Sequence, residues 1–182
     1  MFHSNTEQLI DYWRSRRIGP GAPSRTAIDP GDFIPLLPQV FILGRRGFGE
    51  FHFRLVGALL ADLHGRALRE ESLIGLWEPE DRAPLQLALE TVRRRVEPLV
   101  IEADACPAVG EPLRVELTLA PLTGAAGQAD RMLGLYQPKG RAAILGGQPV
   151  ESLSIRNIIM AGAAGEALPP LRLAAVNGRR IA

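Results

Sequence analysis

The stretch Phe51-His-Phe-Arg-Leu-Val-Gly57, followed at once by Ala58-Leu-Leu-Ala-Asp-Leu-His-Gly65, decides how the rest of the chain is interpreted. In the first half, large apolar residues alternate with His52 and Arg54, a period of two that predicts a half-buried strand. In the second half, leucines recur at spacings of three and four, and Gly65 stands where a left-handed residue would end a helix. A strand that runs directly into a short helix is therefore expected here.

An amphipathic helix is expected before this stretch, over residues 5–17. Leu9, Ile10 and Trp13 recur at helical intervals, and Gly19-Pro-Gly-Ala-Pro23 ends the pattern. The apolar stripe must be buried either on the domain itself or on a second copy of the chain, and the pattern alone leaves both open.

The remaining elements follow from periodicity and turn residues. Residues 39–43 should pair with residues 50–56 as a hairpin, and a seam of apolar residues predicts the longest helix over residues 80–96. Later strands are expected over residues 99–105, 113–122 and 131–137, then a Gly-, Pro- and Ala-rich extension, 138–182, with short strand-like runs at Ser152–Met160 and Leu171–Val176.

Composition narrows the function classes. The 182 residues are 46% apolar, enough for one sizeable core, and the net charge of +1 gives no general reason to expect nucleic acid as a partner. The single cysteine, Cys106, excludes an internal disulfide framework. No run resembles a signal peptide or a membrane span, so we expect a cytoplasmic protein with no membrane partner.

No catalytic or metal-binding pattern stands out. The three histidines, His3, His52 and His64, are too scattered to suggest a metal site, and His64 at a helix end is best explained as a structural residue. The acidic cluster at residues 78–81 fits a helix start, and neither a phosphate-binding loop nor a Gly-x-Ser-x-Gly elbow is present.

The order of these elements resembles the PAS domain superfamily, and within it a bacterial PAS-like family of small, mostly single-domain proteins. The matching residues, spread over residues 10–137, are Pro23-Ser24-Arg25, Ile28-Asp29-Pro30, Leu37-Pro38, Phe53 to Gly57, Leu63 to Arg66 with Leu68-Arg69, Leu76-Trp77, Glu80-Asp81-Arg82, Glu116 to Leu122, and Leu133-Gly134.

The resemblance implies an α+β fold in which a five-stranded antiparallel sheet carries its helices on one face and encloses a small pocket. It divides the chain into an N-terminal helix and linker (1–22), a PAS-like domain (23–137) and a C-terminal extension (138–182). Departures from the family pattern occur at Ala58, where threonine is common, at His64, where an aromatic residue such as phenylalanine is usual, and at Glu70, often glycine.

The resemblance also implies a non-enzymatic sensory or regulatory module that binds a small apolar ligand or a protein partner and signals through non-covalent contacts. No cofactor is assigned. One alternative is a small enzyme with a polar pair in its cavity, and another is an adaptor whose cavity is filled by its own side chains. Convergence of two titratable side chains in the cavity would favour the enzyme.

In the resembled fold, specific residues would line the pocket, with His64 or Thr118 as a polar anchor. The expected lining consists of Phe53, Leu55, Leu60, Leu63, His64, Leu73, Trp77, Leu117, Leu119, Leu133 and Leu135. A homodimer is expected through the N-terminal helix, with Leu9, Ile10 and Trp13 at the interface, because N-terminal helices commonly pair PAS domains.

Overall fold

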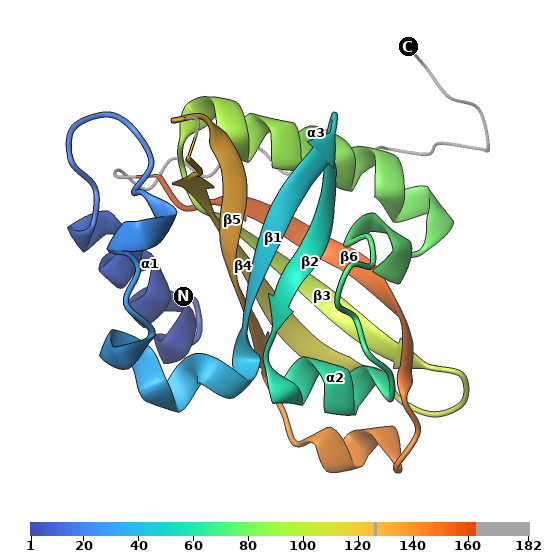
Figure 1. Ribbon diagram of the computed structural model, residues 1–182. Helices are drawn as coiled ribbons and strands as arrows, with labels where there is room; N and C mark the ends of the chain where they lie inside the picture. The colour runs from blue at the N-terminus through green and yellow to red at the C-terminus, as the bar shows by residue number, and fades with distance from the viewer. Residues whose placement is uncertain (126, 163–182) are drawn as a thin grey trace.

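The computed structural model describes residues 1–125 and 127–162, and within them six antiparallel strands form one sheet (Figure 1). The strand order is β2-β1-β5-β4-β3-β6. The strands are β1 (Val40–Gly47), β2 (Glu50–Val56), β3 (Leu99–Pro107), β4 (Leu113–Thr123), β5 (Ala129–Pro138) and β6 (Val150–Met160). The α-helices are α1 (Ser4–Ser15), α2 (Ala58–His64) and α3 (Pro79–Arg95), and the 3₁₀ helices are η1 (Arg25–Ala27), η2 (Pro30–Gln39), η3 (Ile74–Leu76) and η4 (Ala142–Leu145).

The sheet contains one strand more than the five that the resemblance implied. The additional strand, β6, pairs antiparallel with β3 along almost its whole length. It comes from the segment Ser152–Met160, which was expected as a short strand in a C-terminal extension. It joins the sheet because Leu153 and Met160 point into the same core as β3 and are buried there. The other expected short strand, Leu171–Val176, lies outside the described residues.

The helices α2 and α3, with η3 between them, cover one face of the sheet, and the largest core lies beneath them (Figure 1). A buried carboxylate joins α3 to the β1–β2 hairpin: Glu90 accepts hydrogen bonds from the Gly49 N–H (2.8 Å), Arg93 Nε (2.9 Å) and Arg45 Nη2 (3.2 Å). Burial would raise the pKa of Glu90, but these donors outweigh it and hold that pKa below its usual range.

The opposite face of β4 and β5 is covered by α1 and η2 (Figure 1). Leu9, Ile10 and Trp13 are only 0%, 3% and 0% exposed, and the Trp13 indole N–H donates to the Pro121 carbonyl at 2.7 Å. The expected dimer-interface stripe is therefore buried inside its own chain. It packs there because the outward residues of β4 and β5 are apolar as well and need a cover.

A second buried carboxylate holds the start of α1 on the sheet. Glu116 of β4 is 0% exposed and accepts hydrogen bonds from Thr6 Oγ1 (2.8 Å) and the His3 N–H (2.9 Å). Lys139 Nζ lies 2.8 Å from its other oxygen. Burial opposes ionisation, but Lys139, His3 and Thr6 together lower the pKa of Glu116. The helix is thus fixed by polar contacts at its start and by apolar packing along its length.

We expect Trp13→Ala to lower the free energy of unfolding by about 3–5 kcal/mol, because it removes a fully buried indole and leaves the Pro121 carbonyl without its donor. Asp11→Ala, an exposed change on the same helix, should cost less than about 0.5 kcal/mol. Chemical denaturation measures both. If Trp13→Ala left the stability unchanged but dissociated a dimer in sedimentation, the stripe of Leu9, Ile10 and Trp13 would lie between two chains instead.

Gly65 ends α2 in the left-handed conformation, with φ of +61°. This confirms the helix end that the sequence predicted. A Cβ at this position would also stand 3.1 Å from the Pro149 side chain.

Gly65→Val should therefore lower the free energy of unfolding by about 1–3 kcal/mol, since a β-branched residue is strained at positive φ. Gly65→Asn is the matched control, because asparagine tolerates this conformation, and it should cost clearly less. Melting temperatures compare the two. Equal melting temperatures for the valine variant and the wild type would contradict the account of how α2 ends.

Candidate ligand site between the sheet and the helices

Most of the residues expected to line a pocket lie together on the side of the sheet that α2 and α3 cover. They are buried, none more than 7% exposed, and belong to one continuous core. The members in this core are Phe53, Leu60, Leu63, Leu73, Trp77, Leu117 and Leu119, and His64 is buried at the end of α2.

Leu55 is placed differently from the expectation: it lies on the opposite face of the sheet and is 48% exposed. The cause is a β-bulge. Leu43 pairs with Phe53 and Ile42 pairs with Leu55, so Arg54 is an extra residue in β2 and the alternation reverses after it. Leu55 therefore shares the face of Ile42, which packs toward α1 and η2.

Leu133 and Leu135 also face away from the expected pocket, into the core beneath α1. In β5 the residues that point toward α2 and α3 are Met132 and Tyr136. Thr118, considered as a polar anchor, pairs with Leu135 and lies on the same α1 side. The sequence-based prediction put Leu133 and Leu135 on the wrong face of β5. Both faces of this strand are apolar, so the alternation does not indicate which face meets the helices.

His64 is 3% exposed, and neither ring nitrogen makes a hydrogen bond of normal geometry within the described residues. Burial lowers the pKa of His64 to about 4, and the neighbouring Arg66 acts in the same direction. The backbone of Val150 opposes this shift only in part. His64 is therefore a neutral imidazole at pH 7. The sequence predicted that His64 bonds the last carbonyls of the helix, and no such bond is present among the described residues.

Tyr136, which sequence reasoning missed, stands beside His64. The two rings meet edge to face with centroids 6.0 Å apart. The Tyr136 hydroxyl is buried and, like the indole N–H of Trp77, has no hydrogen-bond partner among the described residues. Burial raises the pKa of Tyr136, so it too is neutral. An apolar core thus contains polar groups of His64, Tyr136 and Trp77 whose hydrogen-bonding capacity is unused.

A hollow of about 430 Å³ opens on the surface beside this group of side chains. It lies between α2 and the segment that contains η4, and its wall includes Leu63 and Gly65, the two neighbours of His64 in the chain. Leu145 and Pro149 form the other side. Helix α2 and the segment that contains η4 are therefore what separate His64 from solvent on this side.

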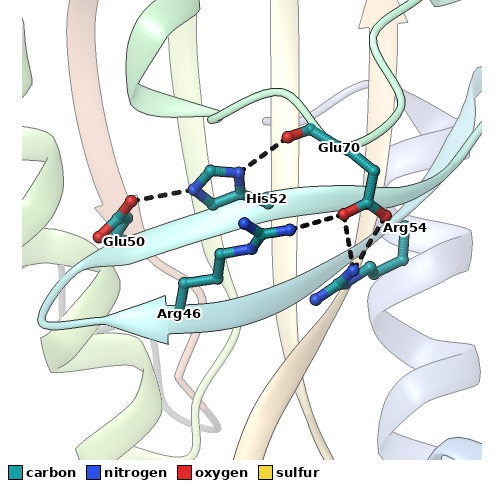
Figure 2. Close-up of polar contacts among 5 residues, drawn as sticks. All are labelled: Arg46, Glu50, His52, Arg54 and Glu70. Carbon is teal, nitrogen blue, oxygen red and sulfur yellow. Dashed lines mark hydrogen bonds and ion pairs between the residues drawn. The ribbon is translucent and has the colours of Figure 1, made fainter.

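His52 and Glu70 belong to a separate polar cluster on the outer face of β2, at the edge where residues 70–73 bond to this strand (Figure 2). The Glu70 carboxylate accepts from Arg54 Nη1 at 2.7 Å and from Arg46 Nη2 at 2.7 Å, and these contacts, Arg54 first, hold the pKa of Glu70 below its usual range. His52 contacts the Glu70 carbonyl through Nδ1 (2.9 Å) and Glu50 through Nε2 (3.0 Å). Glu70 has a φ of +66°, a left-handed conformation that glycine adopts without strain, which fits the glycine that the resemblance implies at this position.

Other candidate chemistry is not supported by the geometry. No three His, Cys, Asp or Glu side chains of residues 1–125 and 127–162 come together as metal ligands would. Burial raises the pKa of the Cys106 thiol, and the carboxylates of Asp104 and Glu78 raise it further, the reverse of what a cysteine nucleophile needs. No helix in the described part of the chain has the length and apolar character required to cross a membrane.

An antiparallel sheet in the order β2-β1-β5-β4-β3, with α2, η3 and α3 between β2 and β3 and packed on one face, defines the class as a PAS-type domain. A family model described as "PAS domain" matches residues 1–137, and the chain belongs to this family.

Solved structures similar to the chain include two light-oxygen-voltage (LOV) proteins. The Rhodobacter sphaeroides LOV protein is 16% identical, with a TM-score of 0.45 over 63% of this chain and 70% of that one. An RNA-binding Light-Oxygen-Voltage receptor is 23% identical, with a TM-score of 0.40 over 55% of this chain and 28% of the other. Comparison with curated proteins finds no match.

The neutral state of His64 predicts a loss of stability at mildly acidic pH. Its pKa falls from 6.5 unfolded to about 4 folded, so the unfolded chain binds the proton first as the pH drops below 6.5. The contribution of His64 to the free energy of unfolding should fall by about 3 kcal/mol between pH 7 and pH 4. Denaturation of wild type and His64→Phe across this range isolates the effect, since the variant retains every other titrating group. Parallel stability curves for the two proteins would show that His64 is not buried in the neutral form.

Proposed function

We propose that this chain is a non-enzymatic sensory module that binds a small, largely apolar molecule between the sheet and α2, and transmits its state through non-covalent contacts. One observation carries the proposal: the Tyr136 hydroxyl and the Trp77 N–H are buried without hydrogen-bond partners within the described residues, and the buried His64 ring, which the Val150 backbone approaches, makes no hydrogen bond of normal geometry there. An unsatisfied buried polar group costs about 1–3 kcal/mol, so a molecule that satisfies two of them recovers a substantial free energy on binding.

The chemistry of the surrounding side chains defines the class of ligand. The core around His64 and Tyr136 is built from leucine, phenylalanine and tryptophan side chains, which favour an aliphatic or aromatic body by burial, at about 25 cal/mol per Å². The ligand should also carry a hydrogen-bonding group at one end, such as a carbonyl or hydroxyl oxygen that accepts from the Tyr136 hydroxyl or the Trp77 N–H. A charged ligand is disfavoured, because the buried residues that surround this core are apolar and would not replace the water that a charge loses on binding.

Access is proposed through the hollow beside α2. This helix has seven residues, too few to be stable without packing, and it carries both His64 and one wall of the hollow. A displacement of α2 would open a path to His64 without disturbing the sheet. It would also move the segment before η3, and so couple occupancy of the site to the surface of the domain.

Two titratable side chains, His64 and Tyr136, converge in this core, as the enzyme alternative requires. Their protonation argues against catalysis. A general base or acid works best with a pKa near the operating pH, whereas burial lowers the pKa of His64 and raises that of Tyr136, away from neutrality in both cases. The pair is suited to hydrogen bonding with a ligand, and we therefore favour the sensory function over the enzyme.

Ligand entry should change the fluorescence of Trp77, which lies in this core, and leave that of Trp13 on the other side of the sheet nearly unchanged. Purified protein is first tested for bound small molecules by mass spectrometry and by its visible absorption spectrum. A library of apolar metabolites is then titrated into wild type, Trp77→Phe and Trp13→Phe. The response should persist in Trp13→Phe and disappear in Trp77→Phe.

Tyr136→Phe keeps the shape of the site and removes one polar partner, so it should weaken binding of an active compound about tenfold. If no compound alters emission or melting temperature and no molecule co-purifies, the chain is better described as an adaptor that works through its surfaces alone.

A further inference from the structure

The outer face of the sheet is covered over β4, β5 and the start of β1, but Leu55 of β2 is exposed on this face. A shallow hollow of about 630 Å³ lies on this open part, and its wall contains three arginines and two apolar residues: Arg25, Ile42, Arg54, Leu55 and Arg131. No acidic residue contributes to the wall. This arginine hollow is separate from the core around His64, because Leu55 and Ile42 point to the opposite face of the sheet.

Three different elements bring the arginines together. Arg131 lies on β5, directly opposite Gly44 of β1, and Arg54 is the extra residue of the bulge in β2. A Cβ at Gly44 would stand 2.8 Å from Arg54 Nε and closer still to Arg131 Nη1, so the glycine is what allows the two guanidinium groups to lie over β1. Arg25 begins η1, which a hydrogen bond from the Thr123 N–H to Pro23 (2.9 Å) ties to the end of β4.

The arginine hollow keeps a surplus of positive charge. Arg54 shares the Glu70 carboxylate with Arg46 (Figure 2). Arg131 is 4.0 Å from Asp130, at the outer limit of an ion pair. Within the described part of the chain, Arg25 makes no ion pair and is exposed. Like charges that converge with little compensation repel one another, and a bound anion relieves that repulsion.

We propose that the arginine hollow binds an acidic segment of a partner protein, one that presents glutamate or aspartate carboxylates next to an apolar side chain. The guanidinium groups match carboxylates in a bidentate geometry. Leu55, 48% exposed, offers the apolar contact beside them. The segment therefore satisfies both parts of the surface: its acids pair with Arg25 and Arg131, and its apolar residue covers Leu55.

The shape and extent of the surface favour this occupant over two others. A small molecule is held by burying most of its own surface, which a shallow hollow with an exposed leucine and exposed arginines does not provide. A nucleic acid needs a long track of cations to match its regularly spaced phosphates, whereas here the positive charge is confined to one place and Glu70 stands beside it.

This inference goes beyond the proposed ligand site and does not depend on it. The arginine hollow lies on the other face of the sheet, so binding of a partner there can be measured whether or not a small molecule occupies the core.

The test uses a short fluorescein-labelled peptide of Glu-Glu-Leu repeats, titrated with the full chain and followed by fluorescence anisotropy. Arg25→Gln with Arg131→Gln should weaken binding about tenfold, since each removes a charge-assisted contact. The matched control is Arg94→Gln with Arg95→Gln, which removes the same charge from two exposed arginines at the end of α3 and should stay within about twofold of wild type. Circular dichroism establishes that all variants are folded.

Three further arms complete the test. A peptide of Gln-Gln-Leu repeats should not bind, and Leu55→Ser should weaken binding of the acidic peptide about threefold, through the lost apolar contact. Equal losses in the two double variants would show attraction to net charge alone and overturn the proposal. So would the absence of any binding by the acidic peptide at low salt, or tighter binding of a short oligodeoxythymidine, which would make the surface a nucleic-acid contact.

Discussion

Burial of both faces of β4 and β5 is the constraint on which the rest of this structure depends. Leu117 and Leu119 face α2 and α3 on one side, while Ala120 and Leu122 face α1 on the other, and all four are essentially inaccessible to water. A strand that is apolar on both faces needs two covers. The N-terminal helix is therefore an integral layer of the domain. Where this cover stops, beside Ile42 of β1 and Leu55 of β2, the sheet has an arginine-lined surface instead.

The fold was largely accessible from the sequence because most elements carry an unambiguous period. The hairpin of β1 and β2, the end of α2 at Gly65 and the long helix α3 all follow from local patterns and turn residues. The sixth strand was recognised as a strand but not as part of the sheet, since nothing local to residues 152–160 indicates that β3 is its neighbour. The surface on which Leu9 and Trp13 are buried is likewise formed by residues of β4 and β5, far along the chain, and cannot be deduced from the local pattern.

The site was predicted less completely, for two physical reasons. A bulge at Arg54 reverses the alternation of β2, so a rule of strict period two placed Leu55 on the wrong face. In β5 the residues of both faces are apolar, so the pattern could not show that Tyr136, rather than Leu133 and Leu135, faces α2 and α3. The residues that do gather in the predicted core lie on β2 before the bulge, on α2, on either side of η3, and on the first half of β4, where apolar residues alternate with Arg114, Glu116 and Thr118. The convergence of the three arginines depends on strand register and on the place of η1 beside the end of β4, and it has no sequence signal.

The bond between Thr6 and Glu116 joins residues 110 positions apart, and this distance sets the order in which the molecule can assemble. Helix α1 is synthesised before β4 and β5, but the surface on which it packs forms only after these two strands have been made and paired. Until then, the stripe of Leu9, Ile10 and Trp13 remains exposed to water, and β1 also waits for β5. Such distant pairings slow folding and prolong the exposure of apolar surface. Helix α1 is thus made before β4 and β5 but is among the last elements of this domain to reach its place.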